Sequence, residues 1–277
     1  MTATTESRVR EIDTPYEGLS STATADFNRD GYVRLSNVLS PETIAEYEPT
    51  ITSEVIRLNT QHLPLEERDT YGKAFLQVTN LWEHNDKVKE LVFSKRLAKI
   101  AADLLGVHSV RLYHDQALYK EPSGGITPWH ADQYYWPLSS DRTVTVWIPL
   151  QETPMEMGPL GFARGSHNFS LGRDLPISDE SEREIRRTVL EQGFEDVVEP
   201  FSLGDVSFHR GWTFHHAGPN RGEVPRRVMT VIYMDADIRV AEPTNDNQRG
   251  DLHWVDRTAV GQVPDTPKNP VLYDARA

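Results

Sequence analysis

An imidazole and a carboxylate stand two positions apart in the segment Trp129-His130-Ala131-Asp132. Alternate side chains of a strand point to the same face, so we expect His130 and Asp132 to reach one point inside a β-structure. Such a pair suits a divalent metal, although a His-x-Asp pair alone is common and is a weak signal. The Gly-rich segment EPSGGITP before it predicts a loop that leads into the site.

A third ligand is expected in the segment SFHRGWTFHHAGPNRGEVPRRVMTVIYM, in which two predicted strands flank a turn. His209 and His215 share the parity of the first predicted strand, and a hairpin would place Arg226 beside that strand. Two His and one carboxylate that leave coordination positions open are typical of non-haem Fe(II) oxygenases. The guanidinium of Arg226 suits a dicarboxylate co-substrate, because it can bind a carboxylate through two parallel hydrogen bonds.

This combination resembles the pattern of the phytanoyl-CoA dioxygenases, a family that also includes ectoine hydroxylase. The family carries an iron-binding His-x-Asp, a later His in a context like HGxGPN, and an Arg eleven residues beyond that His. The motif here is HHAGPN, and aligning its Asn with the family Asn places the ligand at His215 and the Arg at Arg226. Choosing His216 instead would move the Arg to Arg227. We favour His215 with Arg226.

The resemblance covers nearly the whole chain from residue 26 and implies Fe(II), 2-oxoglutarate and O2 as the cofactor set. It also places Trp147 and Lys73 near family positions that contact 2-oxoglutarate. Gln116, on the predicted strand before the metal pair, either points inward near 2-oxoglutarate or is a ladder residue with a solvated amide. Halogenating members of the family lack the carboxylate, so the presence of Asp132 implies oxygenation rather than halogenation.

The elements that must position these residues change in type along the chain. Ser40 and Pro41 predict the start of a helix that runs to about Arg57, and a second helical stretch is expected over about 85–105. From residue 109 to 237, short runs of β-branched and aromatic residues between Gly and Pro predict a mainly β sandwich or barrel. The resemblance implies a double-stranded β-helix (jelly-roll, cupin-like) core with flanking α-helices.

Composition limits the classes of function. The chain has 277 residues, no Cys, and 42 acidic against 29 basic residues, which excludes thiolate chemistry and argues against a nucleic-acid partner. The polar N-terminus and the lack of a long apolar stretch favour a cytoplasmic protein that is not bound to a membrane. We expect a flexible tail over 1–20 and a single domain over 21–277.

Several residues are left with alternatives. His114, His167 and His209 are expected to be structural or surface residues, although the parity of His209 also permits a place beside the iron. The aromatic run 134–136 lines either a substrate pocket or the core.

These observations predict a 2-oxoglutarate-dependent non-haem iron dioxygenase that hydroxylates an unactivated carbon of a small organic substrate, a secondary metabolite. Two alternatives stay open: the same cofactors with desaturation, cyclisation or epoxidation as the outcome, and a non-catalytic cupin-like binding protein. The primary substrate and the oligomeric state are not defined by the sequence.

Overall fold

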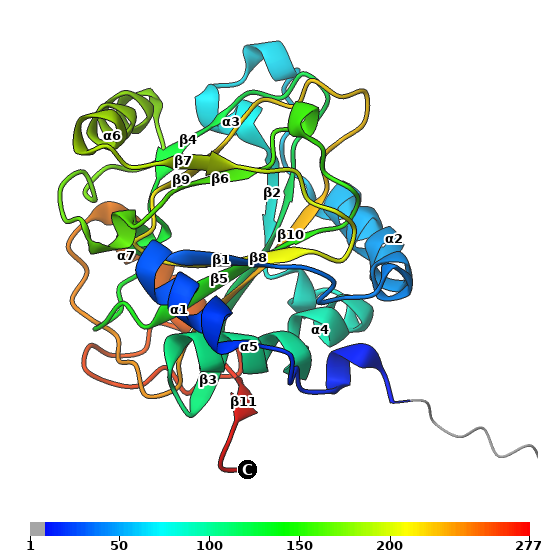
Figure 1. Ribbon diagram of the computed structural model, residues 1–277, viewed down its shortest axis with the longest axis vertical. Helices are drawn as coiled ribbons and strands as arrows, with labels where there is room; N and C mark the ends of the chain where they lie inside the picture. Colours follow the sequence, from blue (N-terminus) through cyan, green and yellow to red (C-terminus); the bar gives the residue numbers. More distant parts are fainter. Residues whose placement is uncertain (1–8) are drawn as a thin grey trace, which may run out of the picture.

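Two antiparallel β-sheets stand opposite each other in the computed structural model, which describes residues 9–277, and most helices cover their outer sides (Figure 1). The larger sheet has the order β1-β8-β5-β10-β3-β11, with β2 also paired to β3, and the smaller has the order β4-β9-β6-β7. This confirms the predicted mainly β, double-stranded β-helix core with flanking helices. The strands are β1 (Tyr32–Leu35), β2 (Leu76–Thr79), β3 (Ser109–Tyr119), β4 (Thr127–His130), β5 (Thr143–Pro149), β6 (Leu160–Ala163), β7 (Asp196–Val198), β8 (Val206–Arg210), β9 (His215–Ala217), β10 (Val228–Asp235) and β11 (Val271–Asp274).

The α-helices are concentrated before the first long strand. They are α1 (Ser21–Asp30), α2 (Pro41–Leu58), α3 (Thr70–Ala74), α4 (Asp86–Val92), α5 (Lys95–Leu105), α6 (Asp179–Gln192) and α7 (Asp246–Asp251). Short 3-10 turns are η1 (Glu11–Asp13), η2 (Leu65–Glu67), η3 (Leu81–Glu83), η4 (Asp132–Tyr135), η5 (Met155–Met157), η6 (Ser166–Asn168) and η7 (Leu252–Val255). Helices α2, α4 and α5 lie along the outer face of the larger sheet, whereas α6 lies beside the smaller sheet (Figure 1).

Helix α2 begins as predicted, because the Ser40 hydroxyl accepts a hydrogen bond from the Thr43 amide at 3.2 Å and Pro41 occupies the first turn. The helical stretch expected over about 85–105 is helical but divided into α4 and α5. The break is at Ser94, whose buried hydroxyl accepts from the Leu97 amide at 3.3 Å and so caps α5. Gly106, with φ of 66°, ends α5 as expected.

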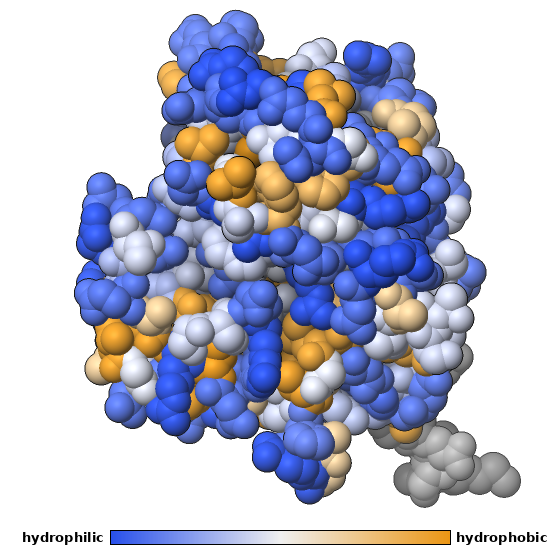
Figure 2. Space-filling model, turned by 60° about the vertical axis from the view of Figure 1, so that its left-hand side comes forward, coloured by the Kyte–Doolittle hydropathy of each residue, from blue (hydrophilic) through white to orange (hydrophobic). Residues whose placement is uncertain are grey.

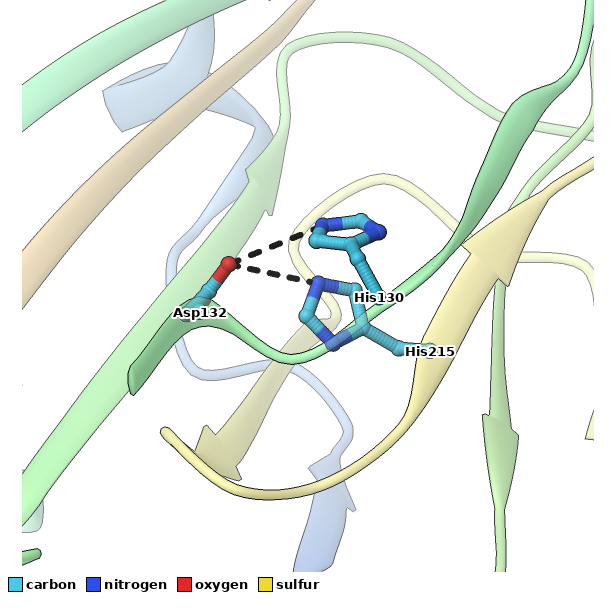
Figure 3. Close-up of side chains that lie close together, drawn as sticks. All are labelled: His130, Asp132 and His215. Atoms are coloured by element: carbon cyan, nitrogen blue, oxygen red, sulfur yellow. Dashed lines mark ion pairs between the residues drawn. The ribbon is translucent and has the colours of Figure 1, made fainter. Parts of the chain in front are cut away.

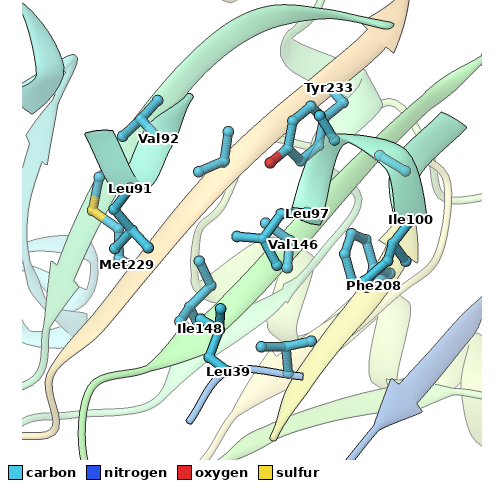
Figure 4. Packing of buried hydrophobic residues seen from close by; sticks show 14 of the residues in the cluster. Leu39, Leu91, Val92, Leu97, Ile100, Val146, Ile148, Phe208, Met229 and Tyr233 are labelled. Atoms are coloured by element: carbon cyan, nitrogen blue, oxygen red, sulfur yellow. The ribbon is translucent and has the colours of Figure 1, made fainter. Parts of the chain in front are cut away.

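The outer face of the larger sheet carries the main apolar core. Leu97 and Ile100 of α5 pack among buried strand residues that include Val146, Phe208 and Tyr233 (Figure 4). Burial of each large apolar side chain contributes about 1.5–3 kcal/mol to folding. Because strand side chains alternate, the other face of the same strands is left free to carry polar residues toward the smaller sheet.

The predicted tail of residues 1–20 lies partly outside the described residues, which begin at residue 9. Within that range Ile12 is only 1% exposed and packs in the main core, and the Glu11 carboxylate accepts hydrogen bonds from Ser40 and Thr43. The packed part of the chain therefore starts before residue 21. The division into a tail and one domain stays a prediction.

The surface is predominantly hydrophilic on the side seen in Figure 2, where apolar atoms form small separate groups. Over residues 9–277, none of the helices has the length and apolar character needed to cross a membrane.

Candidate metal and co-substrate site

A cavity of about 360 Å3 lies between the two sheets and contains most of the predicted site residues. Its walls include His130, Asp132, His215, Arg226, Trp147 and Gln116. Lys73 is not among the residues that line it: Lys73 lies on α3, where its carbonyl oxygen accepts a hydrogen bond from the Gly125 amide at 2.8 Å. The structure therefore brings together six of the seven predicted residues.

His130 and Asp132 converge for a reason other than the predicted one. Strand β4 ends at His130, and Asp132 starts the 3-10 turn η4, so a turn rather than strand alternation aims the carboxylate at the imidazole. His215 stands directly opposite His130 in the antiparallel pair of β4 and β9, and the two ring centroids are 4.0 Å apart. All three side chains point toward one another (Figure 3).

Backbone carbonyls fix the orientation of both imidazoles. The His130 Nδ1–H donates to the Pro128 carbonyl oxygen at 2.7 Å, and the His215 Nδ1–H donates to the Thr213 carbonyl oxygen at 2.9 Å. A carbonyl only accepts, so the proton sits on Nδ1 and the Nε2 lone pair of each ring is free. Burial lowers the pKa of both His residues, which favours the neutral form that binds metals.

Asp132 is held so that one oxygen faces the imidazoles. Its Oδ2 accepts hydrogen bonds from the Thr145 hydroxyl at 3.0 Å and from the His209 Nε2–H at 3.2 Å. Its Oδ1 lies 3.6 Å from the His130 Nε2 and 3.5 Å from the His215 Nε2. Burial opposes ionisation of Asp132, but the facing His215 and the hydrogen bond from His209 lower its pKa. The carboxylate is therefore ionised at neutral pH.

This donor set fits a divalent metal ion. One nitrogen from each of two neutral His residues and one oxygen from an ionised Asp lie within 4.8 Å of one another at the wall of a cavity, which leaves room for further ligands. His209 lies beside the cluster, as its parity permitted, and acts on Asp132 rather than as a ligand. Thr145 was missed from the sequence, although it precedes Trp147 by two residues and so shares its inward face.

Thr145→Val is expected to weaken metal binding about 10–100-fold, because it removes a hydrogen bond that orients the ligand carboxylate. Thr145→Ser keeps the hydroxyl and serves as the matched control, with near wild-type affinity. Calorimetric titration of both apo-variants with Co(II) measures the effect. Equal affinities for the two variants would mean that the Thr145 hydroxyl does not position Asp132.

The adjacent residues His215 and His216 point in different directions, and only one of them can be a metal ligand. His216 points away from the cluster: its ring stacks on Trp129 with centroids 4.0 Å apart, and its Nε2 lies 2.9 Å from the Asp196 Oδ1. His215 is the member of the pair that belongs with His130 and Asp132, which agrees with the preferred alignment of the HHAGPN motif.

Arg226 reaches the cavity by a different route from the predicted hairpin. Strand β9 pairs with β4 and β6 in the smaller sheet, whereas Arg226 forms an isolated bridge with Lys120 just before β10 of the larger sheet. The hairpin prediction is therefore wrong, because the chain changes sheets between His215 and Arg226. The side chain still lines the cavity, on the same parity as Thr230 of β10.

The guanidinium of Arg226 is buried without a carboxylate. The residue is 2% exposed; its Nη1 donates to the Gly158 carbonyl oxygen at 2.5 Å, its Nε has no partner, and it lies 5.6 Å from the Trp147 ring centroid. No acidic side chain within residues 9–277 forms an ion pair with it. Burial lowers its pKa to about 10, which reflects the cost of a desolvated charge. An anionic group in the cavity would offset that cost.

Lys120, at the end of β3, adds a second buried cation next to Arg226. It has no exposed surface, and its Nζ donates to the Gly125 carbonyl at 2.5 Å, the Thr127 hydroxyl at 3.2 Å and the Gly218 carbonyl at 2.9 Å. Burial and the charge of Arg226 lower its pKa. Lys120 was missed from the sequence, because nothing in the mixed polar and apolar segment SVRLYHDQALYK distinguishes its Lys from a solvated one.

The sequence profile of the family described as "Phytanoyl-CoA dioxygenase (PhyH)" matches residues 27–228. A "Probable alpha-ketoglutarate-dependent hypophosphite dioxygenase" of Stutzerimonas stutzeri is 24% identical over 224 residues, which cover 75% of this chain and 76% of that protein. "Phytanoyl-CoA dioxygenase domain-containing protein 1" of Danio rerio is 25% identical over 170 residues, covering 57% of this chain and 56% of that protein.

Solved structures agree in fold. The non-heme alpha ketoglutarate dependent carbocyclase SnoK from nogalamycin biosynthesis superposes with a TM-score of 0.76 at 24% identity, covering 93% of this chain and 99% of SnoK. EctD from S. alaskensis, solved with 2-oxoglutarate and 5-hydroxyectoine, gives a TM-score of 0.67 at 22% identity, covering 85% of this chain and 84% of EctD. At these identities the superpositions establish the fold alone.

The profile spans most of the chain and includes the cluster of His130, Asp132 and His215 together with Arg226. The chain therefore belongs to the phytanoyl-CoA dioxygenase family and is, by class, a 2-oxoglutarate-dependent non-haem iron oxygenase.

Proposed function

We propose that this protein hydroxylates an unactivated carbon of a small organic molecule, a secondary metabolite, with Fe(II), 2-oxoglutarate and O2. One observation carries the proposal. A three-residue ligand set with open positions shares a cavity with a buried guanidinium that lacks a carboxylate partner in residues 9–277. One co-substrate, 2-oxoglutarate, suits both features. It can chelate a metal that has open coordination positions, and its second carboxylate can pair with the guanidinium of Arg226.

Each residue has a defined part in this proposal. The Nε2 atoms of His130 and His215 and the Oδ1 of Asp132 would hold Fe(II), while Thr145 and His209 keep the other oxygen of Asp132 occupied. When bound, iron with 2-oxoglutarate supplies the oxidative chemistry that inserts one atom of O2 into a C–H bond and releases succinate and CO2. The protein orients the target carbon and excludes water.

Arg226 would bind the distal carboxylate of 2-oxoglutarate. The free Nε of Arg226 gives it unused donor capacity toward an anion. Trp147 and Gln116 line this part of the cavity, and Gln116 is held by a hydrogen bond from the Gln77 amide at 3.1 Å. The place of Lys73 on α3 gives it no contact with the cavity wall, so we leave it out of this set.

Hydroxylation is preferred among the outcomes because it needs no group beyond those that hold the metal and orient the substrate. SnoK is called a carbocyclase and its relative SnoN an epimerase, so this fold supports other outcomes in other proteins. The non-catalytic alternative is opposed by the complete ligand set.

Anaerobic titration of the apo-protein with Fe(II) and then 2-oxoglutarate tests the proposal. We expect a visible metal-to-ligand charge-transfer band that appears only with both additions, because the co-substrate would chelate the metal directly. Admission of O2 should then yield succinate. Tight iron binding without a band or succinate would remove 2-oxoglutarate from the proposal and favour the cupin-like binding protein.

A further inference from the structure

A second carboxyl group lines the same cavity: Asp251 contacts Tyr113 of β3, seven positions before the Lys120 that pairs with Arg226. Asp251, the last residue of α7, lines the cavity together with Trp254 of η7 and His114 of β3. None of these three residues has a part in holding the metal or in binding 2-oxoglutarate as proposed above. They come from two segments far apart in the sequence, and their part of the wall is available to a primary substrate.

Asp251 has hydrogen-bond donors around it but no cation. The Tyr113 hydroxyl donates to its Oδ2 at 3.2 Å, and the Trp254 side chain is a second neutral donor. No Lys, Arg or His within residues 9–277 forms an ion pair with it. Burial raises the pKa of Asp251 to about 7. A half-buried carboxylate whose partners are all neutral is less stable than one that meets a positive charge.

His114 adds an acceptor without adding positive charge. It is 2% exposed, and its Nδ1 is buried without a hydrogen-bond partner. Burial lowers the pKa of His114 to about 4, so the ring is neutral at physiological pH. The ring lies 5.5 Å from the Trp254 ring, between centroids, and Trp136 lines the cavity nearby. Faces of aromatic rings attract cations and also pack against apolar groups.

Basic and acidic groups line different parts of the cavity. Arg226, bridged to Lys120 just after β3, lines one part of the wall, whereas Asp251, bonded to Tyr113 of β3, and the neutral imidazole of His114 line another. An anionic substrate would be repelled by the ionised form of Asp251, and a neutral apolar one would leave this carboxylate without a positively charged partner.

We propose that the primary substrate is a small organic cation, an amine whose ammonium group binds Asp251 while its apolar body packs against Trp136 and Trp254. This inference rests on the proposed function, because it assigns the substrate of that same site. The competing role for Asp251 is purely structural, as an anchor that ties α7 to Tyr113 of β3.

Asp251→Asn separates the two roles, because an amide oxygen still accepts from Tyr113 but carries no charge. Asp246→Asn is the matched control: it removes the same charge from the same helix at a side chain that is 94% exposed and outside the cavity. The probes are cyclohexylmethylamine, which is protonated at pH 7.5, and its neutral analogue cyclohexylmethanol. Dissociation constants are measured by ligand-observed NMR on protein loaded with redox-inert Ni(II) and 2-oxoglutarate.

We expect the wild-type protein to bind the amine at least about tenfold more tightly than the alcohol, a difference of about 1.4 kcal/mol. Asp251→Asn should lose that preference and Asp246→Asn should keep it. Equal binding of amine and alcohol by the wild-type protein, or a preference that survives in Asp251→Asn, would overturn the inference, and the wild-type comparison needs no variant to fold.

The affinity for 2-oxoglutarate, measured on the same samples, distinguishes this inference from the proposed function. If the wild-type protein binds Ni(II) and 2-oxoglutarate but shows no amine preference, the substrate inference alone fails. If it does not bind 2-oxoglutarate, the proposed function itself fails, and the substrate assignment falls with it. Asp251→Asn should bind 2-oxoglutarate as the wild type does, because Asp251 contacts neither the metal ligands nor Arg226.

Discussion

His215→Ala is expected to reduce 2-oxoglutarate turnover by more than about 100-fold, whereas His216→Ala should retain activity close to that of the wild type. Loss of a side chain that merely orients a metal ligand typically costs about 10–100-fold in metal affinity or activity, so loss of a ligand should cost more. His215 contributes its free Nε2 to the cluster, whereas His216 is stacked on Trp129 and directed toward Asp196.

Succinate formation and Co(II) affinity, measured for both variants, check this prediction. The adjacent His residues form a matched pair, since each substitution removes one imidazole from β9. His216→Ala should lower stability modestly through the lost stacking on Trp129, without a change in metal affinity. If His216→Ala lost metal binding and His215→Ala kept it, the ligand would be misplaced by one residue, and Arg227 would replace Arg226 as the predicted carboxylate partner.

The sequence predicted six residues that line one cavity, although not Lys73's place outside it, and it did not predict how the backbone brings them together. The alternation argument assumed that His130 and Asp132 lie on one strand, whereas the strand ends at His130 and a 3-10 turn carries Asp132. Similarly, the parity argument assumed that His209 and His215 lie on one strand, whereas His209 lies on β8 and His215 on β9, which belong to different sheets. Residue spacing constrains distances along the chain, but a change of sheet depends on packing between remote segments.

Cavity residues that are not themselves metal ligands were harder to predict from the sequence. Thr145 and Lys120 are buried polar residues on strands, and a sequence pattern does not distinguish a buried Thr or Lys from a solvated one. Asp251 reaches the cavity from α7, which follows β10 and lies outside the residues that the family profile matches. The resemblance to a family supplied the ligands and Arg226 because those residues fall within its motifs.

Arg226→Met is expected to change affinity and stability in opposite directions. Removing one partner of a buried charge pair typically costs about 2–5 kcal/mol, which corresponds to a rise of about 30- to several-thousand-fold in the dissociation constant for 2-oxoglutarate. Without 2-oxoglutarate, however, the guanidinium is a desolvated charge with no anion, and its replacement by an apolar side chain should raise the melting temperature. A gain of about 1 kcal/mol would correspond to roughly 2–4 °C for a domain of this size.

Thermal unfolding of the metal-loaded protein measures both effects. The variant should melt at a higher temperature than the wild type without 2-oxoglutarate, and this order should reverse when 2-oxoglutarate is added. A ligand at about 100 times its dissociation constant stabilises the folded state by about 2.7 kcal/mol, so the wild type should gain stability on addition of 2-oxoglutarate and the variant should gain almost none. Arg227→Ala is the control, since Arg227 is paired with Glu48 and Gln151 outside the cavity and should leave the 2-oxoglutarate response intact. A variant that is less stable than the wild type without co-substrate, yet responds normally to it, would mean that Arg226 serves the fold rather than the carboxylate.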